Sequence, residues 1–237
     1  MKTSLFIVIV IISGAFAGLV HGSANLVIVE PYLDSATSIE QQGLLAEGDD
    51  EARFWAEYEN YRTWQKGGQV IAGILLGVSM GALFGIVYAI SRESLPGGSD
   101  LGKSLFLAGI MWAVVYFVPF LKYPANLPTV GEPETLAFRT ILYLSFVAIS
   151  CMGAVIFYKI SKRFTGRKKL YAFAGYCVLI ISSFVILPNS PDDISLSQGL
   201  VDGFRIASIL GVSAFWVMMG LLFGVLWSKY KPHIHTV

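Results

Sequence analysis

Few residues in this chain have side chains suited to binding a metal ion. His21 lies in an otherwise uncharged apolar stretch, with Asn25 one helical turn later and Glu30 near its outer end. An ionisable residue inside such a stretch is a functional candidate, and a histidine hydrogen-bonded to a neighbouring helix is the equally weighted alternative. His233 and His235 form a short chelating pair in the tail. No three or four ligands occur at metal-binding spacing, so the sequence predicts no high-affinity site.

A second pattern imitates a nucleotide-binding site. Gly97–Ser104 reads G-G-S-D-L-G-K-S and matches the phosphate-binding pattern G-x-x-x-x-G-K-[ST]. That pattern binds nucleotide only between a strand and a helix of an α/β fold. Here it lies in a short loop between two apolar stretches, so we predict that no nucleotide binds. The spans also lack a Ser/His/Asp set, an H-E-x-x-H motif and paired carboxylates, and we therefore predict that the chain is not an enzyme.

The elements that must position these residues are membrane-spanning helices. The 237 residues are 55% hydrophobic and only 14% charged, whereas a soluble domain carries roughly 25% charged residues. We predict an all-α, multi-pass protein of the cell membrane, surrounded by lipid and forming a single polytopic domain over residues 1–237. Its six transmembrane helices are expected at about residues 3–29, 70–90, 104–121, 140–158, 170–187 and 206–228. We expect the first to be retained although A-F-A at Ala15–Ala17 imitates a cleavage site.

Glycines and acids mark the first two spans and their connection. Gly14, Gly18 and Gly22 form one stripe, and glycines at 73, 77, 81 and 85 form another. Such stripes favour a tight helix–helix contact, and a contact that slides during transport is the alternative. We predict that residues 30–67 form an external acidic loop with an interfacial helix before the second span. The acids either gather cations or simply solvate the loop, the more common case.

The charge distribution predicts that both termini are cytoplasmic. Six spans place the two ends of the chain on one side of the membrane. That side holds eleven basic residues: Lys2, Arg92, Lys103, Lys159, Lys162, Arg163, Arg167, Lys168, Lys169, Lys229 and Lys231. The opposite side holds six. Basic loops beside spans favour the cytoplasm, and for the same reason we do not expect the run at 159–169 to bind nucleic acid.

A weak internal repeat suggests three helical hairpins. Each predicted external loop has an aromatic–Arg pair just before the next span or its interfacial helix and a proline beside an acid. Spans 1–2, 3–4 and 5–6 would then be units of one plan, although chance or interface anchoring is an equal alternative. If the hairpins surround one axis, an outer mouth is formed by Glu134, Arg139, Asp202 and Arg205.

The proline-rich connection before the fourth span carries a family resemblance. It reads V-P-F-L-K-Y-P-A-N-L-P-T-V-G-E-P-E-T-L-A-F-R-T and is similar to the signature loop of the CbtA family of cobalt-transporter membrane subunits. Leu127 stands where that family usually has a proline. The glycine-rich second span (Gly68–Ala89) and E-P-Y-L (Glu30–Leu33) also resemble the family, so the similarity extends over most of the chain.

The resemblance implies cobalt uptake for cobalamin synthesis, with a small His-rich membrane subunit as partner. It supplies no ligand residues, and it implies Co²⁺ as transported substrate rather than as a permanently bound cofactor. A non-transporting membrane scaffold that assembles another subunit is the alternative, because the spans contain few charges. A continuous polar cleft lined by His21, Asn25, Glu30, Arg139 and Arg205 would favour transport.

Overall fold

The part of the chain that the computed structural model describes contains helices and their connections and no strand. This part comprises residues 2–46, 51–127, 130–191, 194 and 196–233, without the side chains of 43–59. Its helices are α1 (Thr3–Ala24), α2 (Glu30–Ala46), α3 (Glu51–Ser91), α4 (Asp100–Met111), α5 (Val118–Lys122), α6 (Leu136–Ser161), α7 (Lys169–Ile186) and α8 (Gln198–Tyr230). Two π-helical segments, Asn25–Val29 and Trp112–Phe117, interrupt the first and third spans, and 3₁₀ turns at Pro133–Thr135 and Gly166–Lys168 precede α6 and α7.

Six helical segments within the described residues are long and apolar enough to cross a membrane. They are Thr3–Gln42, Asn60–Ser91, Asp100–Lys122, Pro133–Ser161, Gly166–Ile186 and Gln198–Tyr230. The predicted fold class, an all-α membrane protein with six spans, is therefore confirmed. Each segment contains the corresponding stretch predicted from hydropathy, except for the last residue of span five, Leu187.

The helices group into two compact units rather than one. The first unit contains Met1–Ile110 and Gln198–Val237, and the second contains Met111–Ser197. The boundary falls within the third span, and spans five and six belong to different units. Three equivalent helical hairpins in a single domain stay a prediction, since a grouping by contacts does not test an internal repeat.

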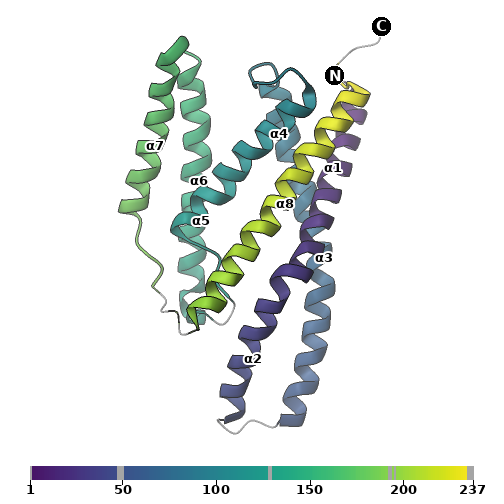
Figure 1. The fold of residues 1–237 in the computed structure, drawn as a ribbon, viewed down its shortest axis with the longest axis vertical. Coiled ribbons are helices and arrows are strands. Elements are labelled where there is room, and N and C mark those ends of the chain that lie inside the picture. The colour runs from purple at the N-terminus through teal and green to yellow at the C-terminus, as the bar shows by residue number, and fades with distance from the viewer. Residues whose placement is uncertain (1, 47–50, 128–129, 192–193, 195, 234–237) are drawn as a thin grey trace. The chain divides into compact units, whose positions relative to one another are not determined.

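The first unit is organised around the contact of α1 with α3 (Figure 1). A Cβ built on Gly22 would lie 2.9 Å from the Cα of Val70, and one built on Gly73 would lie 2.8 Å from the carbonyl oxygen of Gly18. Only glycine permits such an approach of two backbones. The tight contact predicted from the glycine spacing is therefore confirmed.

Helix α8 completes this unit by packing on α1 and α4. Ser104 is fully buried, and its hydroxyl donates a hydrogen bond of 2.7 Å to the carbonyl oxygen of Gly220. At the same end of the unit, the ring of Trp227 packs on the ring of Tyr88, with 5.0 Å between the two ring centroids. The Lys2 amide donates a 2.9 Å hydrogen bond to the carbonyl of Pro232. The two ends of the chain therefore meet at one end of the first unit.

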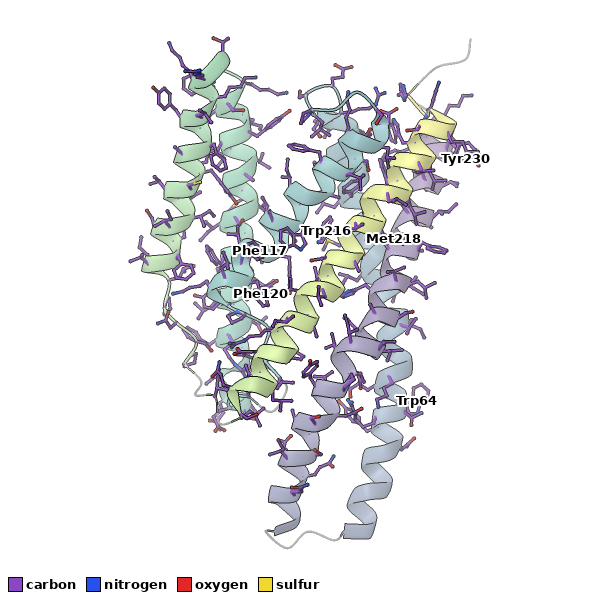
Figure 2. All side chains as sticks on the ribbon, in the orientation of Figure 1. Trp64, Phe117, Phe120, Trp216, Met218 and Tyr230 are labelled. Carbon is purple, nitrogen blue, oxygen red and sulfur yellow. The ribbon has the colours of Figure 1, made fainter. Side chains whose placement is uncertain are left out.

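Helices α2 and α3 continue well beyond the length that a membrane requires. Between Trp64 and Ser91, α3 rises about 40 Å, which matches a bilayer including its headgroups. Trp64 points away from the helices in Figure 2 and is 77% exposed, as is typical of an interfacial aromatic residue. The segment 30–67, predicted as an acidic loop with an interfacial helix, is thus mostly an extension of the first two spans. Its helical part includes Glu30–Ala46, which hydropathy could not distinguish from a loop.

The second unit is built on α6, which packs against α7 and against the π-helical end of the third span. The Ser150 hydroxyl donates to the carbonyl oxygen of Val114 at 2.8 Å and lies 2.9 Å from the Tyr176 hydroxyl. These bonds connect three helices through groups that would otherwise lie unsatisfied in an apolar environment. The proline-rich connection between α5 and α6 lies at the opposite end of α6 from the basic turn.

Candidate functional site

His21 links α1 to α8 in the first unit. Its Nδ1 lies 3.2 Å from the carbonyl oxygen of Gly211, and its Nε2 lies 3.3 Å from Nδ2 of Asn25. A carbonyl only accepts hydrogen bonds, so Nδ1 carries the proton and Nε2 keeps its lone pair. The ring also meets Phe215 edge-on at 5.9 Å. His21 is thus a half-buried imidazole held in one tautomer.

Two local features of the backbone make room for this contact. The helix widens to a π-helical turn at Asn25, immediately after His21, and such turns are frequent at functional sites. On the facing helix, a Cβ on Gly211 would lie only 2.7 Å from Oδ1 of Asn25. A larger residue at 211 would separate the two helices. Sequence analysis missed Gly211, because it lies 190 residues from its partner.

Glu30 lies at a different level and has a different partner. Its carboxylate is buried and pairs with the guanidinium of Arg62 on α3, which also pairs with Asp34. Lys66 completes the cluster with a 3.0 Å contact to Asp34. Glu30 lies about 14 Å along the helix from His21, so the structure does not bring these two predicted ligands together. Arg62 was not among the predicted site residues, although the aromatic–Arg pair at Tyr61 marked its position.

His233 lies at the end where the two ends of the chain meet. Its ring stacks on Trp227 with centroids 6.0 Å apart and planes at 4°. Burial, with the positive charge of Arg92, lowers the pKa of His233 from its ordinary value. His235, the other member of the predicted chelating pair, lies outside the described residues.

The four predicted outer-mouth residues are divided between the units. In the first unit, Arg205 lies 4.0 Å from Asp202, one turn earlier on α8. In the second unit, Arg139 donates hydrogen bonds to the carbonyl oxygens of Val130 at 3.0 Å and of Glu132 at 3.3 Å. Glu134 is exposed in the same unit. A common mouth formed by all four stays a prediction.

The nucleotide-like pattern has no phosphate-binding geometry. No strand precedes it in the described residues, and its last residue, Ser104, is buried against Gly220. The carboxylate of Asp100 is held by Arg92 at 2.7 Å and by the Tyr88 hydroxyl at 3.0 Å. This arrangement caps the start of α4 and joins it to the end of α3. The contact to Asp100 raises the pKa of Arg92, so that side chain stays charged.

Within the described residues, no three histidine, cysteine or carboxylate side chains cluster closely enough to hold a metal ion. Cys151 and Cys177 are free thiols of the second unit. The site around His21 therefore offers one imidazole and one amide, a set suited to brief contact with a cation rather than to tight binding.

Comparison with known families decides what these helices belong to. A family model described as "Probable cobalt transporter subunit (CbtA)" matches residues 3–228, nearly the whole chain. The chain belongs to the CbtA family. This CbtA member is thus a membrane subunit of a cobalt transporter. Its six segments that are long and apolar enough to cross a membrane make it a multi-pass protein. No curated protein and no solved structure matches the chain.

Proposed function

We propose that this CbtA subunit carries Co²⁺ inward across the membrane, supplying metal for cobalamin synthesis. The observation that carries the proposal is the family match over residues 3–228. The cation is transported substrate, and no cofactor is permanently bound. The basic residues around both ends of the chain support the predicted orientation with cytoplasmic termini.

His21 is the residue that we propose contacts the cation on its path. Metal-binding histidines commonly donate their second ring N–H to a backbone carbonyl, which fixes the tautomer and raises the basicity of the other nitrogen. The bond from His21 to Gly211 has this form, and it leaves the lone pair of Nε2 toward Asn25. An entering cation would replace the Asn25 amide at Nε2. Because the bond to Gly211 holds the ring in place, the exchange of the Asn25 amide for the cation at Nε2 would be local and reversible.

The other predicted ligands have different roles in this proposal. Glu30 neutralises the charge of Arg62 near the membrane surface, and its main role is structural. His233, with His235 two residues later in the sequence, is proposed to receive a released ion on the cytoplasmic side. Glu134, Arg139, Asp202 and Arg205 are proposed to form the outer mouth.

The subunit is proposed to act with a partner and to catalyse no reaction itself. The described residues around Gly97–Ser104 lack the strand of a nucleotide-binding site, and we propose that a gradient or a second subunit supplies the energy. We propose a small His-rich membrane subunit as this partner, and membrane lipid as the remaining surroundings. The proposal assigns no catalytic residues, and the chain is not an enzyme.

The test is uptake of radiolabelled cobalt by cobalt-starved cells. The chain is expressed alone, with the small subunit, and as His21→Ala and Asn25→Ala variants. Ser23→Ala is the matched control, because Ser23 is an exposed residue of the same helix. Saturable uptake that cobalt displaces better than nickel or zinc is expected. His21→Ala should reduce it at least tenfold at unchanged membrane abundance, whereas Ser23→Ala should not.

The alternative function is a scaffold that stabilises another subunit without passing the ion. Sparse charge within the spans favours it. In that case the small subunit alone would take up cobalt, and this chain would change only the abundance of the small subunit. Uptake that persists in His21→Ala would remove His21 from the path even if transport itself were established.

A further inference from the structure

A cavity of about 360 Å³ opens within the second unit, beneath the proline-rich connection. Its walls come from the end of the third span, the connection and the first turns of α6. Tyr116, Phe120, Tyr123 and Tyr143 contribute aromatic surface, and Asn126, Arg139, Thr140 and Ser190 contribute polar groups. A cavity of this size and mixed lining is typical of a small-molecule site.

The lining is not suited to a divalent cation. Arg139 is the charged residue among those that line the cavity, and no carboxylate, imidazole or thiol is among the lining residues. The helix that carries Arg139 begins only three residues earlier, at Leu136. The positive end of its dipole therefore adds to the charge of Arg139. The electrostatics favour an anion.

Tyr116, one of the residues that line the cavity, has a hydroxyl without a hydrogen-bond partner in the described part of the chain. The oxygen of this hydroxyl is buried. In an apolar environment an unsatisfied hydroxyl is costly. By contrast, the hydroxyl of Tyr123 already donates to the carbonyl of Pro188 at 2.6 Å. Tyr116 therefore points to a ligand that supplies an oxygen acceptor.

The connection holds Arg139 in place for such a ligand. Its hydrogen bonds to the carbonyls of Val130 and Glu132 fix the guanidinium against the connection, and Val130 and Leu127 are only 1% exposed. Arg139 lies about 4.5 Å from the start of a helix about 39 Å long. Since the hydrocarbon core is about 30 Å thick, this depth is that of lipid phosphates.

We propose that this cavity binds a phosphate group, with Arg139 and Tyr116 contacting its oxygens and the aromatic walls covering its apolar substituent. This site is separate from the proposed cation path through His21. A phospholipid headgroup and free phosphate share this chemistry. The depth of Arg139 and the aromatic walls favour the lipid.

The test is ligand-dependent thermal stabilisation of the delipidated full-length protein in a non-ionic detergent. Phosphatidylglycerol, inorganic phosphate and diacylglycerol are added in separate titrations. The variants are Arg139→Gln and Tyr116→Phe, and the matched control is Arg163→Gln at the other end of the second unit, where Arg163 is exposed. Because each protein is compared with itself with and without ligand, a loss of basal stability does not imitate a loss of binding.

We expect phosphatidylglycerol to raise the melting temperature saturably in the wild type and in Arg163→Gln. Tyr116→Phe should raise the phosphatidylglycerol concentration at half-saturation about tenfold, since one hydrogen bond to a charged group is lost. Stabilisation by inorganic phosphate with the same dependence on Arg139 and Tyr116 would support the site and identify free phosphate as its source. An equal effect of diacylglycerol, or an unchanged response in both variants, would overturn the proposal.

Discussion

Glu30 and Arg62 form a buried ion pair that ties the start of α2 to α3, with side chains only 7% and 8% exposed. The pair lies about 42 Å from Lys2 along the first helix, close to the far headgroups of the bilayer. On the N-terminal side of the pair, α1 touches α3 through glycines, and on its other side α2 and α3 continue as the extension. The pair therefore marks the level at which packing by backbone contact ends.

Replacing Arg62 by Ala is expected to destabilise the protein by about 3–5 kcal/mol, because Glu30 would remain buried without a counter-charge. Thermal unfolding in nanodiscs, followed by far-UV circular dichroism, measures this. Lys66→Ala is the control, since Lys66 is 40% exposed and an exposed pair contributes about 0–1 kcal/mol. Equal effects of the two substitutions would show that the Glu30–Arg62 pair is not buried in the membrane.

Gly18→Ala is expected to cost about 1–3 kcal/mol, because the new methyl group would meet the backbone of α3 and force the helices apart. The Cβ would lie 2.9 Å from the Cα of Ile74. Gly68→Ala is the matched control on α3, since nothing lies within 4 Å of its Cβ. That control should be neutral or stabilising by up to about 1 kcal/mol. A stable Gly18→Ala protein would contradict the close packing.

Docking of the C-terminal segment is expected to weaken in acid. The pKa of His233 is lowered when its ring stacks on Trp227, so the docked form favours neutral imidazole. The stabilisation is therefore complete above the ordinary pKa of about 6.5 and is lost as pH falls from there toward the lowered value. Hydrogen-exchange protection factors at residues 229–233 between pH 5 and 8, corrected for the intrinsic pH dependence of amide exchange, measure this.

His233→Phe keeps an aromatic ring on Trp227 and removes the titration. Its protection factors, which are the exchange rates corrected for the intrinsic pH dependence of amide exchange, should be constant over the same range. If His233→Phe and the wild type show the same pH profile, the change does not belong to His233 and the expectation is wrong.

Nucleotide is expected not to bind at Gly97–Ser104. The hydroxyl that would meet the metal of a nucleotide belongs to Ser104 and already donates to Gly220 in the core. Isothermal titration with Mg-ATP should give no saturable heat, and Lys103→Ala should behave like the wild type. Saturable binding that Lys103→Ala abolishes would overturn this expectation.

Hydropathy and glycine spacing predict the membrane-spanning part of this fold well. Long apolar stretches must be helical in lipid, since backbone groups have no other partners there. The stripe from Gly14 to Gly22 predicts that its helix packs closely on another helix, although it does not say which one. These features depend on residues close together in the chain.

The remaining features depend on distant residues, which no local pattern reveals. Gly211 meets His21 across 190 positions, and Arg62 meets Glu30 across 32. The π-helical turn at Asn25 has no distinct apolar periodicity. The grouping of spans five and six into different units depends on packing faces, and apolar faces toward lipid and toward protein have the same composition.

The first unit is assembled from the beginning and the end of the chain, whereas the second is one continuous segment, Met111–Ser197. During synthesis the second unit can therefore be complete while α1 still lacks α8. The contact of His21 with Gly211 forms only after residue 211 has been synthesised, and the bond between Lys2 and Pro232 only after residue 232. Such long-range closure is slow in folding. We expect α1 and α3 to pack early through their glycines and to form a partly folded intermediate in the membrane. A translocon or a chaperone must protect this intermediate until α8 is inserted.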